Sequence, residues 1–221
     1  MLPEIAMISA EAGCTWEALV AHQLRAPLAA LTQKLTPGQT IATEDVTPDV
    51  RRMLRLIDQL QVSGSCTSDA AASPEPFNLR TLTRNAAAML TPLALARGQS
   101  LQLRDVASHD RLALGKATLV SEAIANLIGN AIKYAPRNSR IDLVTMGGGD
   151  IYVLDRGTGL SGKDATRVFN PFVRGRNAAD DEGSGLGLYL VKRIADLSHG
   201  TVGYMSRKGG GAVFRLHLPL A

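Results

Sequence analysis

The stretch LVSEAIANLIGNAIKYA, residues 119–135, decides how the second half of the chain folds. Its apolar residues recur every three or four positions, which is the spacing of one face of an α-helix. A long helix is therefore expected here. Its predicted buried face consists of Leu119, Ala123, Leu127, Ile128 and Ala131.

The polar residues of this helix fall on the opposite stripe. Asn126, Asn130 and Lys133 are spaced at i, i+4 and i+7, and Tyr134 follows them. Two amides and a cation on one stripe can hold a phosphate group together with its metal ion. A solvated polar helix face explains the same spacing, so this segment alone does not establish a site.

The segments around this helix alternate between helical and strand patterns. Helices are expected at 77–98 and 185–200, and strands at 100–106, 111–115, 140–146, 150–157, 201–206 and 211–220. Neighbouring strands joined by glycine turns predict hairpins and a mostly antiparallel sheet. We therefore expect an α+β fold, a two-layer sandwich with the helices on one sheet face, and not an alternating βαβ fold.

The first part of the chain has a different pattern. Apolar residues at helical spacing predict two helices, over 16–35 and 46–60, joined by a connection rich in proline and glycine. A helical hairpin this small has too little core to stand alone, so we expect two copies to form a dimeric four-helix bundle. The expected organisation is a tail at 1–10, the hairpin at 11–63, a linker at 64–76 and the sandwich at 77–221.

Composition excludes several classes of protein. The net charge of +4 is spread along the chain, whereas a nucleic-acid-binding protein needs a denser basic stripe. No run approaches 18 apolar residues, and residues 1–13 do not resemble a signal peptide, so no membrane span is expected in this chain. Cys14 and Cys66 form no metal-binding pair and are expected to be reduced thiols in the cytoplasm.

The sequence HQLRAPL, residues 22–28, places a histidine in the first predicted helix. His22 points away from the apolar stripe and lies near Arg25 and Ala26. Pro27 removes a backbone donor and loosens the helix beside the histidine. A surface or capping histidine is the ordinary explanation, but a costly proline beside a reactive side chain favours a function.

Three further segments have patterns that fit ligand binding. In DRGTGL, residues 155–160, a strand ends in an aspartate that could accept a hydrogen bond from an exocyclic amine, and the following glycines allow close approach. VFNPFVRG, residues 168–175, carries two phenylalanines and a basic end in a loop, as a pinned lid would. GSGLGL, residues 183–188, opens a helix whose first N–H groups suit an anion. An ordinary turn and buried loop aromatics explain the first two segments equally well.

Together, and in this order, the segments resemble bacterial sensor histidine kinases of two-component systems. HQLRAPL is similar to their histidine box and NLIGNAIKY, residues 126–134, to their N box. DRGTGL and GSGLGL are similar to the two glycine boxes, and VFNPFVRG is similar to the F box. The resemblance extends from about residue 11 to the C-terminus.

This resemblance implies specific roles. The hairpin would be the dimerisation and histidine-phosphotransfer domain, and the sandwich would bind ATP as in Hsp90-type and gyrase-type ATPases. His22 would accept the phosphoryl group, with Gln23 and Arg25 beside it as catalytic residues, and Asn130 would hold Mg²⁺. The implied ATP-binding residues are Asn126, Asn130, Lys133, Tyr134, Asp155, Gly157, Gly159, Phe169, Phe172, Arg174, Gly183, Gly185, Gly187 and Leu188.

The resemblance also implies a response regulator receiver domain and a second copy of the chain as partners. The expected location is the cytoplasm, either as a free protein or as the cytoplasmic part of an inner-membrane sensor. Two positions depart from the family pattern: Gln23 replaces a residue that is commonly acidic, and Ala26 replaces a threonine or asparagine that supports phosphatase activity. These departures leave open an alternative, an adaptor or sequestering dimer that binds nucleotide but phosphorylates poorly.

Overall fold

The computed structural model describes residues 28–29, 32, 74–106, 112–171, 173 and 185–221. The chain divides into two compact units, Met1–Leu60 and Gln61–Ala221, and nearly all described residues belong to the second. The predicted hairpin lies almost entirely outside the described residues, so its fold and the homodimer stay predictions. Within the described part of the chain, no helix combines the length and apolar character that crossing a membrane requires.

A five-stranded sheet forms one layer of the second unit, in the order β2-β4-β5-β7-β6. β2 pairs with β4 in parallel, and the other three neighbouring pairs are antiparallel. This arrangement confirms the predicted mostly antiparallel sheet and both predicted hairpins. The strands are β2 Ser100–Asp105, β4 Arg140–Met146, β5 Asp150–Leu154, β6 Thr201–Ser206 and β7 Ala212–His217.

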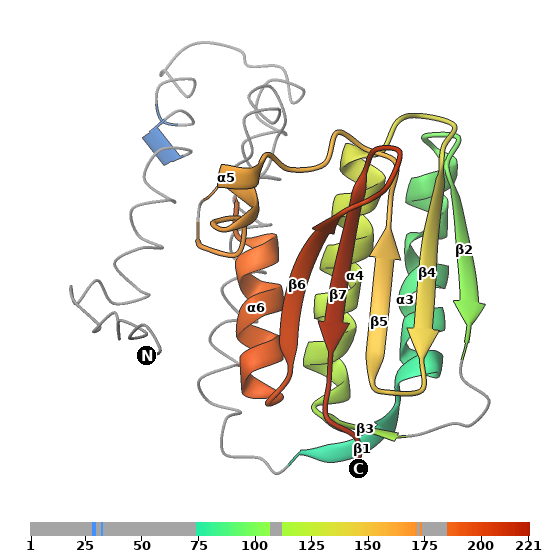
Figure 1. The fold of residues 1–221 in the computed structure, drawn as a ribbon, viewed down its shortest axis with the longest axis vertical. Coiled ribbons are helices and arrows are strands. Elements are labelled where there is room, and N and C mark those ends of the chain that lie inside the picture. Colours follow the sequence, from blue (N-terminus) through green and yellow to red (C-terminus); the bar gives the residue numbers. More distant parts are fainter. Residues whose placement is uncertain (1–27, 30–31, 33–73, 107–111, 172, 174–184) are drawn as a thin grey trace, which may run out of the picture. The chain divides into compact units, whose positions relative to one another are not determined.

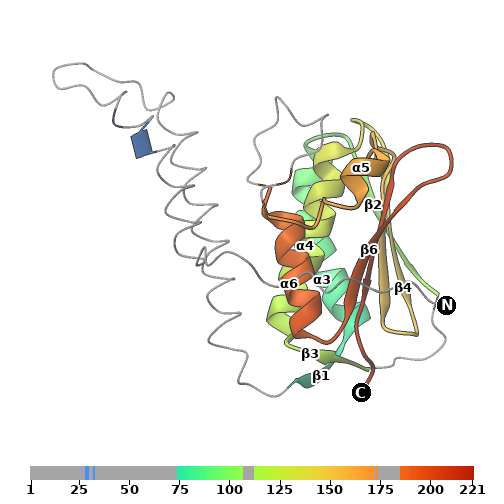
Figure 2. The ribbon, with the colours of Figure 1, turned by 60° about the vertical axis from the view of Figure 1, so that its left-hand side comes forward.

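Three helices form the second layer and lie together on one face of this sheet, as Figures 1 and 2 show from two directions. They are α3 (Leu79–Leu95), α4 (Ala117–Tyr134) and α6 (Gly187–Leu197). A short helix, α5 (Gly162–Ala165), lies between β5 and α6 in the chain. The two-layer α+β sandwich expected from the sequence is therefore confirmed.

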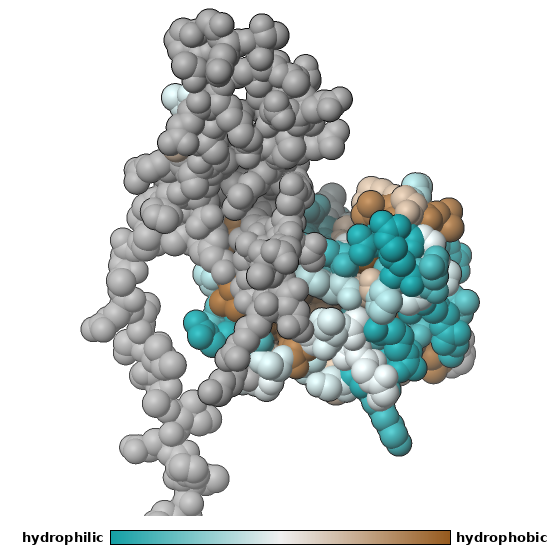
Figure 3. Space-filling view, turned by 90° about the horizontal axis from the view of Figure 1, so that it is seen from above, coloured by the Kyte–Doolittle hydropathy of each residue, from teal (hydrophilic) through white to brown (hydrophobic). Residues whose placement is uncertain are grey.

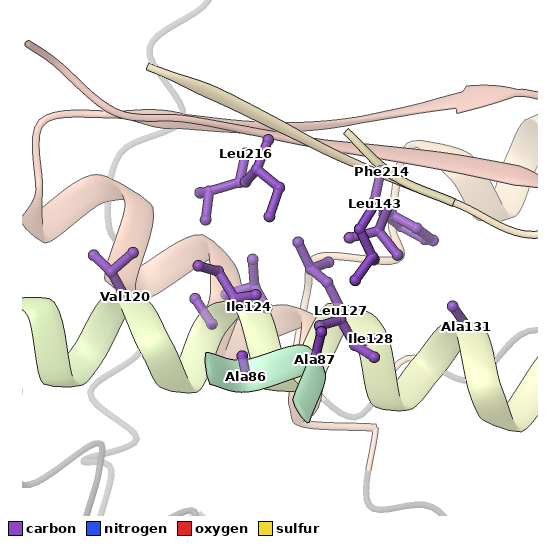
Figure 4. Packing of buried hydrophobic residues seen from close by; sticks show 14 of the residues in the cluster. Ala86, Ala87, Val120, Ile124, Leu127, Ile128, Ala131, Leu143, Phe214 and Leu216 are labelled. Carbon is purple, nitrogen blue, oxygen red and sulfur yellow. The ribbon is translucent and has the colours of Figure 1, made fainter. Parts of the chain in front are cut away.

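Helix α4 is the centre of the core. The five residues of its predicted apolar face are all buried, and Val120, Ile124 and Ile132 are buried as well. The buried face is wider than the pattern predicted because α4 contacts α3 and α6 on its flanks as well as the sheet. Figure 4 shows the α4 side chains facing Leu143 and Leu216 of the sheet.

The start of α3 corrects one detail of the sequence interpretation. A helix was expected from Phe77, but residues Glu75–Asn78 form strand β1, which pairs with β3 (Leu112–Gly115). The Asn78 side chain then caps the helix by accepting a hydrogen bond from the Thr81 amide at 3.0 Å. An asparagine in extended backbone is a favoured N-cap, so the helix begins only after it.

Candidate functional site

The predicted ligand-binding segments meet at one end of the sandwich. β5 and α4 end there, and α6 begins there; in Figure 1 this is the upper end of the domain. Figure 3 views the molecule from this end and shows hydrophilic and hydrophobic residues side by side on the described surface. The contacts described below join segments that are far apart in the sequence.

Asp155 follows the last residue of β5 and is only 3% exposed. Its Oδ1 atom accepts hydrogen bonds from the amides of Gly157 at 2.7 Å and Ala212 at 3.2 Å. Among the residues that the structure describes, no donor reaches its second oxygen, Oδ2. The side chain is buried as a whole, and Oδ2 is the oxygen that remains available to a donor from a ligand.

Burial raises the pKa of Asp155 above its ordinary value of 3.8. The hydrogen bonds from Gly157 and Ala212 and the positive charge of Arg207 act in the opposite direction, but burial has the larger effect. A buried carboxyl group with a raised pKa at the end of a strand is a candidate for a functional site. Here the group combines a fixed oxygen with one that is available for recognition.

The loop after Asp155 is packed so closely that glycine is required. A Cβ atom added to Gly157 would lie 2.5 Å from the carbonyl oxygen of Tyr134, the last residue of α4. Gly159 has a backbone φ of +65°, which residues other than glycine rarely adopt. A Cβ added to it would lie 3.1 Å from the carbonyl oxygen of Gly211. The loop is thus fixed between the end of α4 and the turn that precedes β7.

The asparagines of α4 face the start of α6. A Cβ added to Gly187, the first residue of α6, would lie 3.0 Å from Asn126 Oδ1 and 3.9 Å from Asn130 Nδ2. Both asparagines are partly buried, and Asn126 Nδ2 donates a hydrogen bond to the carbonyl oxygen of Glu122 at 3.0 Å. Gly185 turns the chain into the helix with a φ of +70°. Two amide side chains and a helix N-terminus, which attracts anions, are therefore adjacent.

The last turn of α4 adds a cation beside an aromatic ring. Lys133 Nζ lies 5.1 Å from the centre of the Tyr134 ring, within the range of a cation–π contact. The carbonyl oxygen of Lys133 accepts a hydrogen bond from Arg97 Nη2 at 3.2 Å. Gln99 Nε2 also donates to the carbonyl oxygens of Ile132, Ala135 and Pro136, so this end of the helix is fixed by the loop between α3 and β2.

The segment with the phenylalanines is attached to the sheet. Phe169 is partly buried and packs edge to face on Phe214 of β7, with 6.3 Å between the ring centres. Nearby, the Leu160 amide donates to the Tyr204 hydroxyl at 2.9 Å. Leu188 packs against the core from the first turn of α6. The structure thus buries Val168 and packs Phe169 against the core, whereas Asn170 is exposed.

Several predicted site residues cannot be placed. They lie outside the described residues and are His22, Gln23, Arg25, Phe172, Arg174 and Gly183. The sequence interpretation missed other residues that contact Asp155, namely Arg207, Gly211 and Ala212. The run of glycines at 209–211 was a signal for them, because consecutive glycines before a strand often mark a close approach of backbone.

These residues suit a purine nucleotide that carries an exocyclic amine. Asp155 Oδ2 provides an acceptor that has no donor among the described residues, at the end of β5. The amides of Asn126 and Asn130 and the start of α6 provide polar partners for phosphate oxygens. In the described part of the chain no cluster of three or more His, Cys, Asp or Glu residues could form a metal site of its own.

A mixed sheet covered on one face by three helices, with a buried aspartate at a strand end, agrees with the ATPase family that the comparison finds. Residues 115–221 match the family described as histidine kinase-, DNA gyrase B- and HSP90-like ATPase. The sensor-like histidine kinase SenX3 of Mycobacterium tuberculosis is 33% identical over 215 residues, which cover 90% of this chain and 52% of SenX3. The chain thus spans about half the length of this relative.

Solved structures show the same fold. Full-length ShkA in complex with AMPPNP has a TM-score of 0.64 and 24% identity, covering 92% of this chain and 45% of ShkA. The histidine kinase AdeS of Acinetobacter baumannii has a TM-score of 0.64 and 17% identity, covering 91% of this chain and 95% of AdeS. The family match and the similarity to SenX3 confirm the resemblance to two-component sensor histidine kinases, and residues 115–221 form the histidine kinase-, DNA gyrase B- and HSP90-like ATPase domain.

Proposed function

We propose that this chain is an ATP-dependent protein-histidine kinase. It would bind ATP with Mg²⁺, transfer the γ-phosphoryl group to His22 and pass it to an aspartate of a response regulator. The observation that supports this most strongly is the buried Asp155, whose Oδ2 has no donor among the described residues while Oδ1 is held by two amides. The matching family and the sensor kinase relatives support the same assignment.

Asp155 would recognise the adenine base. Its Oδ1 is already occupied, so the carboxylate cannot turn freely, and Oδ2 would accept a hydrogen bond from the exocyclic amine. Gly157 and Gly159 would keep the loop close to the end of α4 and to the turn before β7, because side chains at these positions would meet the carbonyl oxygens of Tyr134 and Gly211. A buried hydrogen bond to a charged acceptor gives strong discrimination against nucleotides that lack the amine.

The phosphates would lie between α4 and α6. Asn130 would be a ligand of Mg²⁺, which would offset the charge of the phosphate oxygens and is commonly held by few protein ligands. Asn126 and Lys133 would lie near the phosphates, and Gly183, Gly185 and Gly187 would let the backbone close over them. The AMPPNP bound to ShkA, a structural neighbour, supports nucleotide binding by this fold.

The residue types suit transfer to a histidine better than hydrolysis. A glutamate activates water in related ATPases, at the position that the resemblance aligns with Asn126, and an amide is not a base. A neutral imidazole such as that of His22 is a good nucleophile near pH 7. Gln23 would orient this ring through its amide oxygen, and Arg25 would lie on the same helix face. ATP would therefore be retained until the histidine approaches.

The remaining partners follow from this function. We propose a homodimer through the hairpin and a response regulator receiver domain as phosphoryl acceptor, in the cytoplasm. Ala26 would support phosphatase activity poorly, because its side chain cannot position a water molecule. Gln23 and Ala26 also favour the second candidate function, an adaptor or sequestering dimer that binds nucleotide with little kinase activity.

A two-stage transfer assay separates these functions. The chain is incubated with labelled ATP and Mg²⁺, the nucleotide is removed, and a receiver domain from the same organism is added. A kinase becomes labelled in the first stage and loses the label to the receiver in the second. An adaptor binds ATP but stays unlabelled, and it gains label only from a receiver that was phosphorylated beforehand.

A further inference from the structure

Arg207 connects the sheet to the main chain of Asp155. It lies in the turn between β6 and β7, and only 14% of its side chain is exposed. Its Nη2 atom donates to Asp142 Oδ2 at 2.8 Å, and its Nη1 atom donates to the carbonyl oxygen of Asp155 at 3.1 Å. One guanidinium group thus holds a side chain of β4 and the backbone at the end of β5.

Asp142 is an unusual residue for its position. It lies in the interior strand β4, opposite Leu154 of β5, and its side chain is 6% exposed. Its neighbours Ile141 and Leu143 face the helices, so Asp142 lies on the other sheet face. Arg140 Nε lies 3.0 Å from Oδ1 without forming a hydrogen bond to it. A buried ion pair adds little net stability, so the function that we assign to this pair is to hold the Arg207 guanidinium in place.

The turn that carries Arg207 is itself fixed against Asp155. The Arg207 amide donates to the carbonyl oxygen of Gly211 at 3.1 Å, and Gly209, Gly210 and Gly211 all have positive φ. A Cβ on Gly211 would lie 2.2 Å from the Asp155 carbonyl oxygen. Figures 1 and 2 show this turn at the end of the domain where β5 ends. The turn therefore contacts the backbone of Asp155 and, through the Ala212 amide, its side chain.

We propose that Arg207, held in place by Asp142, is a positioning residue for the adenine-recognising carboxylate of Asp155. By fixing the carbonyl group of Asp155, it fixes the side chain so that Oδ2 points toward the exocyclic amine. Arg207 does not touch the nucleotide in this account. This role rests on the proposed recognition of adenine by Asp155. Arg207 and Asp142 would be the residues that hold the Asp155 carboxylate in the orientation that recognition needs.

The test compares ATP with purine riboside triphosphate, which lacks the exocyclic amine. Dissociation constants for both are measured on the full chain for wild type and Arg207→Lys. Lysine keeps the charge, but one ammonium group cannot reproduce the two directed hydrogen bonds of the guanidinium fork. Wild type should prefer ATP by roughly 10- to 100-fold, the effect of one hydrogen bond to a charged group. Arg207→Lys should reduce this preference to about threefold or less, mainly by weakening ATP binding.

The matched control is Arg215→Lys. Arg215 makes a similar pair with a carboxylate on the sheet, donating from Nε to Asp150 Oδ1 at 2.7 Å, but it does not contact Asp155. The Arg215→Lys variant should prefer ATP over purine riboside triphosphate by the same factor as wild type. Asp142→Asn serves as a second variant if Arg207→Lys does not fold, because asparagine can still accept the hydrogen bond from Nη2. It should lower the preference by a smaller factor.

The outcomes are distinguishable. If both nucleotides bind more weakly to Arg207→Lys by the same factor, the preference is unchanged and Arg207 is only a structural residue, which overturns the inference. If wild type itself shows no preference for ATP, the proposed adenine recognition by Asp155 fails, and the inference fails with it. A lost preference in Arg207→Lys alone supports the positioning role.

Discussion

Gly187 lies directly against Asn126: a Cβ on the glycine would be 3.0 Å from the Oδ1 atom of the asparagine. This contact joins the second glycine segment to the asparagine stripe of α4, although residues 126 and 187 are 61 positions apart in the sequence. Asn126 cannot easily move away, because its Nδ2 atom is bonded to the carbonyl oxygen of Glu122. The proposed phosphate site therefore depends on the absence of a side chain at residue 187.

Gly187→Ala should impair use of the nucleotide while the fold is retained. The added methyl group displaces the Asn126 amide by a few tenths of an ångström, and the rate of self-phosphorylation should fall roughly tenfold. The matched control is Gly129→Ala, since Gly129 lies inside α4 with nothing within 4 Å of its Cβ position. That control should keep its rate and gain about 0.5–1 kcal/mol of stability from better helix propensity. Equal rates in both variants would contradict the assignment.

Asp155→Asn should abolish preferential ATP binding without unfolding the domain. The asparagine oxygen can still accept the amides of Gly157 and Ala212, but its NH₂ group then faces the exocyclic amine of adenine, donor against donor. ATP affinity should fall roughly 10- to 100-fold, measured by titration calorimetry. Asp196→Asn, which changes an exposed carboxylate paired with Lys192, is the control and should bind as wild type does.

The same variant tests the pKa of Asp155. Because burial raises this pKa, the folded protein holds the proton more tightly than the unfolded chain does. The free energy of unfolding therefore contains a contribution that decreases as pH rises from the ordinary carboxyl range through the raised pKa. Asp155→Asn lacks this contribution, so its stability relative to wild type should improve as the pH rises above the ordinary carboxyl value of 3.8. Urea unfolding of both proteins at several pH values measures this difference in the free energy of unfolding. If the variant becomes less stable relative to wild type as the pH rises, the pKa of Asp155 is lowered in the folded protein and not raised.

Gly157→Ala should damage both the fold and the site. Its Cβ would lie 2.5 Å from the Tyr134 carbonyl oxygen, a backbone atom that is fixed at the end of α4. We expect a loss of about 1–3 kcal/mol in the free energy of unfolding, together with weaker nucleotide binding. Gly203→Ala is the control, because nothing lies within 4 Å of its Cβ position in β6. Wild-type stability in Gly157→Ala would mean that the loop has room to move.

Gln23→Glu should speed self-phosphorylation. A carboxylate can take the proton of the imidazole or balance its charge, whereas the amide of Gln23 can only orient the ring. General base catalysis contributes about 100-fold or more to a rate. We therefore expect the rate of self-phosphorylation to rise roughly tenfold in Gln23→Glu. Gln33→Glu makes the same chemical change elsewhere in the predicted helix and should have no effect. An unchanged or slower rate in Gln23→Glu would refute this role.

Much of the fold followed from local patterns in the sequence. The helix over 119–135 and the strand pair around the glycines at 147–149 were predictable, because periodicity and turn residues are local signals. Asp155 was predictable as a site residue for the same reason, since it ends a strand and precedes two glycines. The sequence also indicated the asparagine stripe, which the structure places against Gly187.

The contacts that complete the site could not be predicted in this way. Arg207 and Asp142 are 65 residues apart, and neither belongs to a recognisable motif. The parallel pairing of β2 with β4 also depends on the whole sheet, because it joins strands that are not consecutive in the chain. Such contacts are determined by tertiary packing, and no periodicity of a single segment indicates them.

The central claim is that ATP bound at Asp155 phosphorylates His22. The most direct measurement is incubation with Mg²⁺ and γ-labelled ATP for wild type, His22→Ala and Asp155→Asn, followed by an acid-lability test. We expect acid-labile label on wild type, none on His22→Ala and little on Asp155→Asn. Label that persists in His22→Ala, or wild type that binds ATP but gains no label, would contradict it.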